Sequence, residues 1–371
     1  MISQRYGGLK IVFHPEKLKS LKEEIIASPM YVRFKPTNRC NHHCSFCACD
    51  PETGDTSVRS LLNRTAEIPR EKMLEILRDF KEMGVKAVTY SGGGEPLIHP
   101  YIEKAMKKTL EYGIGLSIIT NGQELNGEKA EILSKANWVR VSTNSNDSKT
   151  FSKIRRRPES WFSELEENIR RFAKMKRPGC EFGINYVVQT ENAFQVYDSV
   201  KYFMDLGVNH VKITPMWNQD FKKYHEPIKE SVLGQIAKAK IDFHKESVFE
   251  VHDTYAGDFS GASVPERHYQ RCYIMQTVPV IGADCNVYFC HDKAYSTTGI
   301  LGSIRDKSFR ELWFSPEAAE IFRKFNPQES CRHHCTNDAK NLHIKGVINR
   351  EPGYEILSDA LDCYGEDVNF V

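Results

Sequence analysis

Residues 40–47 read Cys40-Asn41-His42-His43-Cys44-Ser45-Phe46-Cys47, a C-x3-C-x2-C spacing that follows a short apolar segment. Three thiolates this close together can bind three irons of a cubic [4Fe–4S] cluster and leave the fourth iron open, which favours a catalytic site. Structural zinc is the alternative, and it takes four protein ligands. The nearby candidates for a fourth zinc ligand are His42, His43 and Cys49.

A glycine-rich turn, Ser91-Gly92-Gly93-Gly94-Glu95-Pro96, follows the next apolar run at 85–90. Glycines after a strand let the backbone approach a ligand closely, although such a turn alone is also typical of an ordinary strand-to-helix loop. Phe46, between the second and third cysteines, offers a ring that could stack on an adenine. With these features and the order of the later elements, nearly the whole chain resembles the radical S-adenosylmethionine (SAM) superfamily.

The resemblance implies that SAM binds to the open iron through its amino and carboxylate groups. The backbone of Gly92, Gly93 and Gly94 would receive the amino group, with Glu95 nearby. The other residues implied around SAM are Ser142 at the ribose or carboxylate, Asn121 in the same pocket, and Val188 on the adenine side. The run 155–157, three arginines, either clamps a carboxylate, because guanidinium presents paired donors, or forms a solvated basic face.

The length and composition fit a globular protein with an ample core: the chain has 371 residues, of which 40% are hydrophobic and 27% are charged. The net charge of +2 points to neither nucleic acid nor an anionic membrane as the main partner. The first residues lack an apolar core of signal-peptide length, and no stretch approaches a membrane span, so we expect a cytoplasmic protein. Cytosolic thiols stay reduced, so the eleven cysteines are not expected to form a disulfide framework. Their clustering toward both ends predicts two metal sites, with Cys180 between them as a small buried hydrophobe.

Strands alternate with helices between about residues 30 and 215. The predicted strands are 31–35, 87–90, 115–120, 138–142, 184–188 and 210–213, and the main predicted helices begin at 69, 101, 162 and 193. This alternation predicts a parallel α/β sheet covered by helices, a partial (β/α)6 TIM-like barrel, which the resemblance also implies. The cysteine loop, the glycine turn, Asn121, Ser142 and Thr214 all fall at C-terminal strand ends, where βα barrels gather functional groups.

The pattern changes near residue 220, which divides the chain into four predicted parts. These are an N-terminal extension at 1–29, the barrel at 30–220, a charged linker of helices at 221–255, and a small α+β domain at 256–371 that carries the second group of cysteines.

In that last part, Cys272 is followed after 17 intervening residues by Cys290, and Cys331 and Cys335 come about forty residues later. The runs 278–281 and 286–289 around a Gly-Ala-Asp-Cys turn predict a β-hairpin. This order is similar to the SPASM and twitch extensions of radical SAM enzymes, and it implies that these four cysteines hold one auxiliary [4Fe–4S] cluster. A zinc site with four cysteine ligands is the alternative.

Two features depart from the family pattern. The family usually has glycine five residues before the hairpin cysteine, where this chain has Cys285, and its loop pair is often C-x2-C rather than C-x3-C. Cys285 or Cys363 would substitute if one of the four ligands is wrong. His333 and His334 are expected outside the ligand set.

The resemblance implies an enzyme: one electron, from a donor such as flavodoxin or ferredoxin, cleaves SAM to a 5′-deoxyadenosyl radical that removes hydrogen from the substrate. Net oxidation is the expected outcome, and epimerisation with Cys285 or Cys363 as catalytic hydrogen donor is the alternative. His210, Lys212, Asn218, His252 and Asp253, expected near the barrel mouth, would suit a sugar, an aminocyclitol or a nucleotide-linked sugar.

The second expectation for the substrate is a ribosomally made peptide. The stretch before the first strand is too short for the winged peptide-recognition domain found on many peptide-modifying relatives. The non-enzyme alternative is a zinc-stabilised binding protein, which would be colourless where an iron–sulfur protein is brown.

Overall fold

The computed structural model describes residues 8–49, 59–218, 220–245, 248–257, 266–331, 335–351 and 369–370. Within them, one sheet has the strand order β10-β9-β8-β1-β2-β3-β4-β5-β6-β7. Neighbouring strands from β1 to β7 pair in parallel, and β8 pairs in parallel with the other side of β1. The strands are β1 (Tyr31–Phe34), β2 (Ala87–Tyr90), β3 (Gly115–Thr120), β4 (Trp138–Ser142), β5 (Glu181–Val188), β6 (His210–Pro215), β7 (Glu250–Asp253), β8 (Val280–Ile281), β9 (Asn286–Tyr288) and β10 (Ile300–Ser303).

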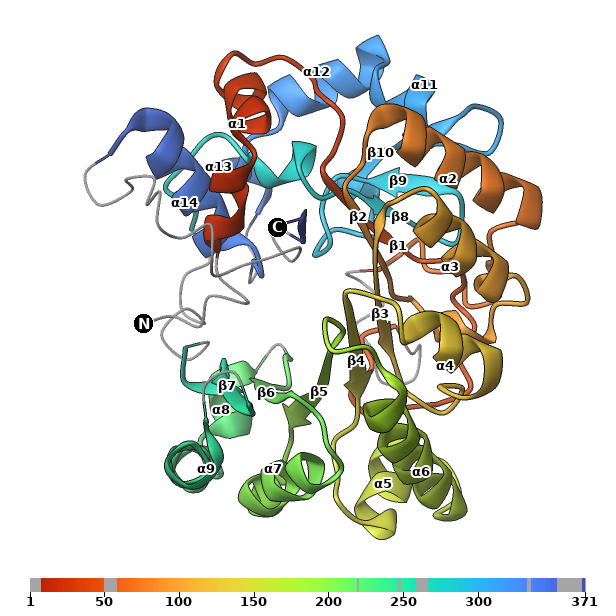
Figure 1. Ribbon diagram of the computed structural model, residues 1–371. Helices are drawn as coiled ribbons and strands as arrows, with labels where there is room; N and C mark the ends of the chain where they lie inside the picture. The colour runs from red at the N-terminus through yellow and green to blue at the C-terminus, as the bar shows by residue number, and fades with distance from the viewer. Residues whose placement is uncertain are drawn as a thin grey trace.

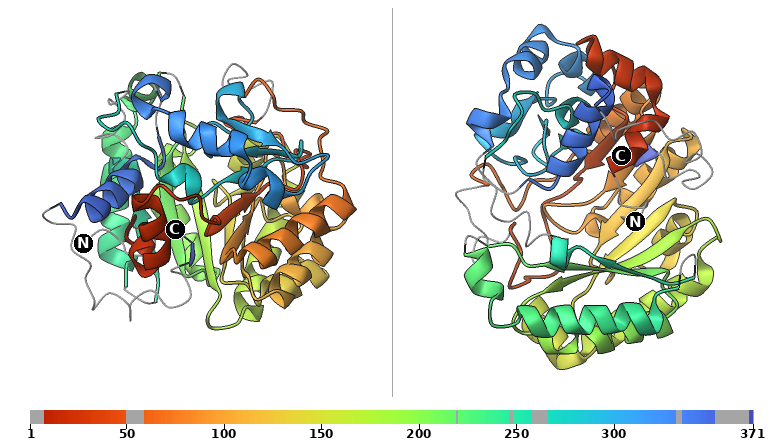
Figure 2. Two further views of the ribbon diagram at one scale, coloured as in Figure 1. Left: turned by 90° about the horizontal axis from the view of Figure 1, so that it is seen from above. Right: turned by 90° about the vertical axis from the view of Figure 1, so that its left-hand side faces the viewer.

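Helices cover the convex side of the arc that β1 to β7 form (Figure 1). These are α2 (Arg70–Met83), α3 (Ile102–Glu111), α4 (Gly127–Leu133), α5 (Ser148–Arg155), α6 (Ser160–Met175), α7 (Val196–Asp205) and α9 (Lys229–Phe243). The remaining helices are α1 (Pro15–Lys22), α8 (Phe221–His225), α11 (Phe309–Trp313), α12 (Pro316–Lys324), α13 (Pro327–Ser330), α14 (Asp338–Asn349) and the short 3-10 turns η2 (Gly8–Phe13), η3 (Pro96–Ile98), η4 (Ala193–Gln195), η5 (Ile274–Gln276) and η6 (Thr297–Gly299). In both views of Figure 2, α14 lies beside α1 at the open side of the arc. Within the described ranges no helix is both long and apolar enough to cross a membrane.

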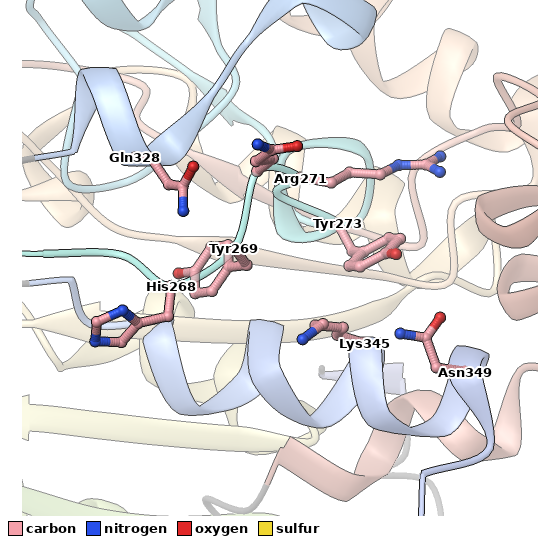
Figure 3. A pocket seen from close by; sticks show the side chains of 8 residues that line it. His268, Tyr269, Arg271, Tyr273, Gln328, Lys345 and Asn349 are labelled. Carbon is pink, nitrogen blue, oxygen red and sulfur yellow. The ribbon is translucent and has the colours of Figure 1, made fainter.

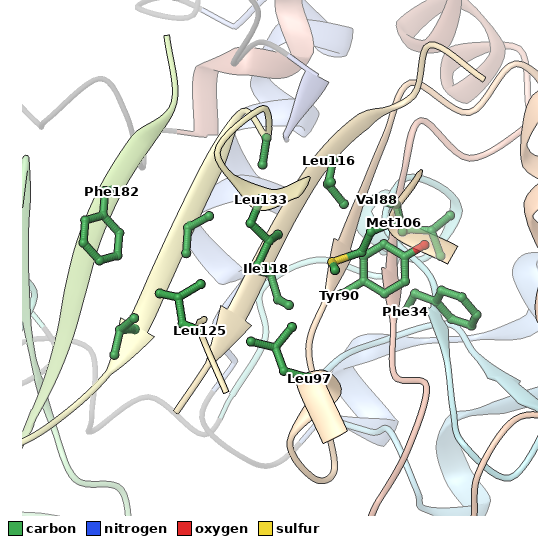
Figure 4. Close-up of a cluster of buried hydrophobic side chains, with 14 of the residues drawn as sticks. Phe34, Val88, Tyr90, Leu97, Met106, Leu116, Ile118, Leu125, Leu133 and Phe182 are labelled. Carbon is green, nitrogen blue, oxygen red and sulfur yellow. The ribbon is translucent and has the colours of Figure 1, made fainter. Parts of the chain in front are cut away.

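The main hydrophobic core lies between the sheet and these outer helices (Figure 4). Side chains alternate along a strand, so Phe34 and Tyr90 face the helices while their neighbours face the concave side. On α2, buried residues recur at helical spacing and close this layer. The helix ends at Gly84, whose φ of 73° is the left-handed conformation that glycine adopts without steric cost. Cys180 is buried in this core, as predicted from the sequence.

The partial barrel is confirmed, and the structure extends it. The predicted bounds of β2, β3 and β4 agree with those observed, and the other three strands differ only at their ends. The segment assigned to a linker of helices contains α8 and α9 but ends in β7, a seventh parallel strand paired with β6. The sequence did not reveal β7 because it has four residues, only one of them aliphatic. The predicted hairpin is present as β8 and β9, and it continues the sheet beyond β1.

Candidate functional site

The loop after β1 carries the first three cysteines and is fixed from several sides. Cys44 is buried, and Cys40 and Cys47 are half-buried. The Cys44 thiol acts electrostatically on both of the others, so the three sulfur atoms lie close together. Burial raises the pKa of Cys40 to about 12, and a hydrogen bond with Cys49 raises the pKa of Cys47. Thiols in such surroundings ionise when a metal supplies the compensating positive charge, so this donor set fits a metal cluster.

The glycine turn packs directly against the cysteine loop. A Cβ added to Gly93 would lie 2.2 Å from Asn38 Oδ1, and one added to Gly94 would lie 1.8 Å from the carbonyl oxygen of Arg39. The Glu95 amide donates to that same carbonyl at 2.8 Å. The glycines therefore allow two backbones of the protein to meet, in addition to the approach to a ligand that the sequence suggested.

Glu95 joins the turn to the end of β3. Its buried carboxylate accepts hydrogen bonds from the Leu97 amide at 3.0 Å, the Thr120 hydroxyl at 2.7 Å and the Asn121 amide at 2.6 Å. Burial raises the pKa of this carboxyl to about 7. Asn121 in turn donates through Nδ2 to Asn41 Oδ1 at 2.7 Å. Both side chains thus hold the cysteine loop and its neighbours in place.

The three arginines at 155–157 have separate positions. Arg155 ends α5 and is buried; its Nη1 donates to the Cys44 sulfur at 3.1 Å, and its Nη2 donates to the Ser142 carbonyl. Its guanidinium carbon lies 5.5 Å from the centre of the Phe46 ring. Arg156 has the left-handed φ of 51° that ends the helix, and Arg157 lies over Trp161. Arg155 therefore reaches the cysteine loop and the end of β4 together.

Buried polar atoms without a hydrogen-bond partner among the described residues gather at the same strand ends. They are Ser91 Oγ after β2, Thr143 Oγ1 and Asn144 Nδ2 after β4, and Gln189 Nε2 after β5. Gln189 Oε1 also accepts from Ser45 of the cysteine loop at 3.5 Å. Buried polar groups are normally paired, so these atoms fit a site for a polar ligand such as SAM. Sequence reasoning missed them, although each follows a predicted strand by one to two residues.

The resemblance also placed Val188 on the adenine side of SAM. Its side chain is fully buried in the helix-covered core. Because side chains alternate along β5, the next residue, Gln189, lies on the other face of the sheet, beside the cysteine loop.

The second group of cysteines comes together from four segments. Cys272 precedes η5, Cys290 follows β9, Cys331 ends α13 and Cys335 precedes α14. Burial raises the pKa of all four thiols, and Cys272 is in electrostatic contact with each of the other three. Asn341 of α14 fixes the backbone around Cys272: its Nδ2 donates to the Arg271 carbonyl at 3.1 Å, and its Oδ1 accepts from the Tyr273 amide at 2.6 Å.

Cys285 is not part of this group. It lies in the turn between β8 and β9, buried, with a left-handed φ of 61°. Its charged neighbours are Arg305, Asp284, Lys72 and Glu75. The left-handed φ gives a physical reason for glycine at this position in the family. Cys363, His333 and His334 lie outside the described residues.

Among the described residues, no three His, Cys, Asp or Glu side chains converge on a position for a single metal ion. The four thiolates of a cubic cluster each bind a different iron, so they lie further apart than the ligands of one ion. Both cysteine groups therefore fit iron–sulfur clusters by the chemistry and burial of their donors.

The expected substrate residues divide between the two ends of the barrel. His210 is the first residue of β6, so it lies at the edge opposite the C-terminal strand ends, beside His252 at 5.2 Å between ring centres. The expectation that His210 lies near the barrel mouth is wrong. The mouth is at the C-terminal ends of the parallel strands, and β6 begins at His210. Asp253 lies 3.1 Å from Lys240 of α9, and Asn218 is exposed. Lys212 is the third residue of β6, so it lies between the two ends of the strand.

A cavity of about 370 Å³ lies in the C-terminal part, beside the backbone that carries Cys272 (Figure 3). It is lined by His268, Tyr269, Gln270, Arg271, Tyr273, Gln328, Lys345 and Asn349. None of the predicted site residues that the structure describes lines it.

Two family models match the chain: the radical SAM superfamily over residues 34–215 and the SPASM iron–sulfur cluster-binding domain over residues 272–336. The chain belongs to the radical SAM superfamily and carries a C-terminal domain of the SPASM/twitch type. Its cofactors are accordingly SAM, a [4Fe–4S] cluster and an auxiliary cluster.

Among curated relatives, the PqqA peptide cyclase of Methylocella silvestris is 24% identical over 83% of this chain and 80% of its own. The S-adenosylmethionine-dependent nucleotide dehydratase of Flammeovirga pacifica is 27% identical over 43% of this chain, which spans only 54% of that relative's length. Streptococcus suis SuiB bound to its precursor peptide SuiA is similar in fold, with a TM-score of 0.60, 18% identity, and coverage of 93% of this chain and 79% of SuiB.

Proposed function

We propose that this enzyme uses the 5′-deoxyadenosyl radical derived from SAM to remove a hydrogen atom from a peptide, with net loss of two hydrogens from the product. The observation that carries the chemistry is the meeting of three thiols, Arg155 and the unpartnered polar atoms at one edge of the barrel. The peptide is supported by two relatives that match over most of their length, a peptide cyclase and a peptide-bound structure.

The protein's own part is binding, orientation and exclusion of water. Cys40, Cys44 and Cys47 would hold the cluster that supplies one-electron reduction of SAM. Arg155 would present its guanidinium to the SAM carboxylate, and Gln189 has a buried amide for a polar group of the same ligand. A flavodoxin or ferredoxin would deliver the electron.

The second electron has to leave the substrate radical for a net oxidation. The thiols of Cys272, Cys290, Cys331 and Cys335 would hold the acceptor of this electron, while the substrate loses a proton to solvent. Epimerisation would need a thiol beside the substrate, and Cys285 is buried in the turn between β8 and β9, where its charged neighbours among the described residues are Arg305, Asp284, Lys72 and Glu75. Dehydrogenation and cross-link formation both remove two hydrogens from the peptide, so both agree with the proposal.

A polar small molecule is the second candidate substrate, as a sugar, an aminocyclitol or a nucleotide-linked sugar. Two observations favour it: Arg33 on β1, Arg140 on β4 and Lys212 on β6 alternate with core residues and so extend to the concave face of the sheet, and some relatives are named for nucleotides.

Product analysis separates these candidates. Reconstituted enzyme, SAM and reductant are incubated anaerobically with panels of peptides and of sugars, and 5′-deoxyadenosine and product masses are measured. A product two mass units lighter supports the proposal. A product of unchanged mass that takes up one solvent deuterium indicates epimerisation, and no 5′-deoxyadenosine with or without substrate contradicts the enzymatic role.

A further inference from the structure

Three parallel strands carry a cation on their concave face. Arg33 on β1, Arg140 on β4 and Lys212 on β6 are each flanked in sequence by two residues of the main hydrophobic core. Because side chains alternate along a strand, these three extend to the side opposite the helices. They come from strands far apart in the sequence, so the sheet rather than a local charge run brings them to one face.

Further cations reach the same region from other elements. Burial, together with Arg33, Lys10 and Lys212, lowers the pKa of Lys340 on α14 to about 7. Lys35, which directly follows β1, is also buried, and burial and Arg59 lower its pKa to about 7. We refer to the following six residues as the cationic layer: Arg33, Lys35, Arg59, Arg140, Lys212 and Lys340.

The cationic layer lies between the two groups of cysteines. Arg140 precedes Ser142 by two residues on the same face of β4, so it lies one step inside the strand ends described above. Lys35 begins the loop that carries the first cysteines. On the other side, His291 directly follows Cys290 and is within electrostatic reach of Arg33, Lys35, Arg59 and Arg140.

Among the described residues, no acidic side chain forms an ion pair with Arg33, Lys35, Arg140 or Lys340. Glu181 and Glu250 begin β5 and β7, at the opposite edge of the barrel, and Glu250 lies 3.1 Å from His252. Asp284 acts on Lys35 but accepts hydrogen bonds from Asn286 and Tyr288. The buried Nε of Arg140 has no hydrogen-bond partner within the described part of the chain. Several clustered cations in a partly buried space cost free energy unless an anion compensates them.

We infer that the cationic layer binds an anionic group of the substrate, a phosphate or a carboxylate, and holds it between the two cysteine groups. The inference rests on the proposed function, because it assigns the substrate's position in the same barrel. Guanidinium groups bind both anions through paired hydrogen bonds. A phosphate ester of a small molecule and an acidic side chain of a peptide supply the same chemistry.

Equilibrium dialysis tests the inference with two probes, inorganic diphosphate and an end-blocked peptide that contains two glutamates. Reconstituted full-length protein is saturated with SAM, so that SAM's own carboxylate does not compete. Arg33→Gln and Arg140→Gln are expected to weaken binding at least tenfold each, which corresponds to one charge-assisted pair. The matched control is Arg170→Gln, an exposed arginine of α6 paired with Glu166 at 2.8 Å, which should bind as the wild type does.

The two probes identify the source of the anion: preference for diphosphate indicates a phosphate ester, and preference for the peptide indicates an acidic side chain. Wild-type protein that binds neither probe, or Arg33→Gln and Arg140→Gln variants that bind like Arg170→Gln, would overturn the inference. If the Arg33→Gln or Arg140→Gln variant loses its iron, probe binding by the Lys340→Gln variant on α14 tests the inference instead.

The rival explanation is that the cations only compensate the negative charge of the clusters. Then the variants would shift the reduction potentials and leave probe binding unchanged, which also overturns the inference. Failure of the proposed function gives a different result, because no peptide product two mass units lighter would then form, whatever the dialysis shows.

Discussion

The two groups of cysteines are built in opposite ways. Cys40, Cys44 and Cys47 lie within eight residues of one loop, and the fold adds the glycine turn and Arg155 around them. The second group runs from Cys272 to Cys335 and takes one thiol from each of four segments. A local group keeps its spacing as long as its loop is intact, whereas a dispersed group depends on every contact that holds its segments together.

The largest effect should follow from removing the local group. In the triple variant Cys40→Ala, Cys44→Ala, Cys47→Ala, formation of 5′-deoxyadenosine should fall at least about a thousandfold, because a one-electron cleavage without its reductant has no alternative route. Chromatography with mass detection measures it. The iron of the second group should remain, at roughly four atoms per chain against roughly eight in the wild type. Normal SAM cleavage by this variant would contradict the assignment.

Replacing one member of the dispersed group should separate the two sites. Cys331→Ser should leave SAM cleavage measurable while product formation falls by about a hundredfold, since the second electron loses its acceptor. The ratio of 5′-deoxyadenosine to product is the measurement. Cys285→Ser is the control, because the charged neighbours of Cys285 among the described residues belong to the β8–β9 turn, α2 and Arg305 rather than to the second group of cysteines. An equal loss of iron in both variants would show that Cys285 is a ligand.

Gly94→Ala tests the packing around the local group. The added methyl would lie 1.8 Å from the Arg39 carbonyl oxygen, so the cysteine loop has to move, at a cost of about 2 kcal/mol in the free energy of unfolding. SAM cleavage should fall about tenfold. Gly234→Ala on the exposed side of α9 is the control, because its methyl meets no atom within 4 Å. It should leave cleavage unchanged and stabilise the helix by about 0.8 kcal/mol. Equal activities in the two variants would contradict the close packing.

The smallest effect is expected at Cys285. Changing it to glycine removes the cost of a left-handed backbone, about 1–2 kcal/mol, and loses a comparable amount of buried side chain. The free energy of unfolding should therefore stay within about 1 kcal/mol of the wild type, as measured by denaturant titration. Cys180→Ala has no such compensation and should be the less stable of the two. A loss of auxiliary iron in Cys285→Gly would instead make Cys285 part of the second group.

The sequence predicted best what depends on neighbouring residues. The strands β2 to β4, the hairpin and the first cysteine spacing follow from short periodic patterns and from adjacent thiols. It could not predict that Arg155 is buried against Cys44 while Arg156 is exposed, because the end of α5 decides between them. Nor could it reveal Asn341 beside Cys272, since Asn341 comes 69 positions after Cys272 in the chain. The seventh strand was missed because its pairing with β6, rather than its composition, makes it a strand.

The pairing of β8 with β1 has a consequence for how this protein can be divided. The edge of β1 that would be exposed in an isolated barrel is covered by β8, through the Arg33 amide donating to the Pro279 carbonyl at 3.0 Å and the Lys35 amide donating to the Ile281 carbonyl at 2.9 Å. An uncovered edge strand offers its amides and carbonyls to any other chain. A barrel expressed without residues 272–351 would therefore self-associate through β1, so the barrel and residues 272–351 belong together in one expressed unit.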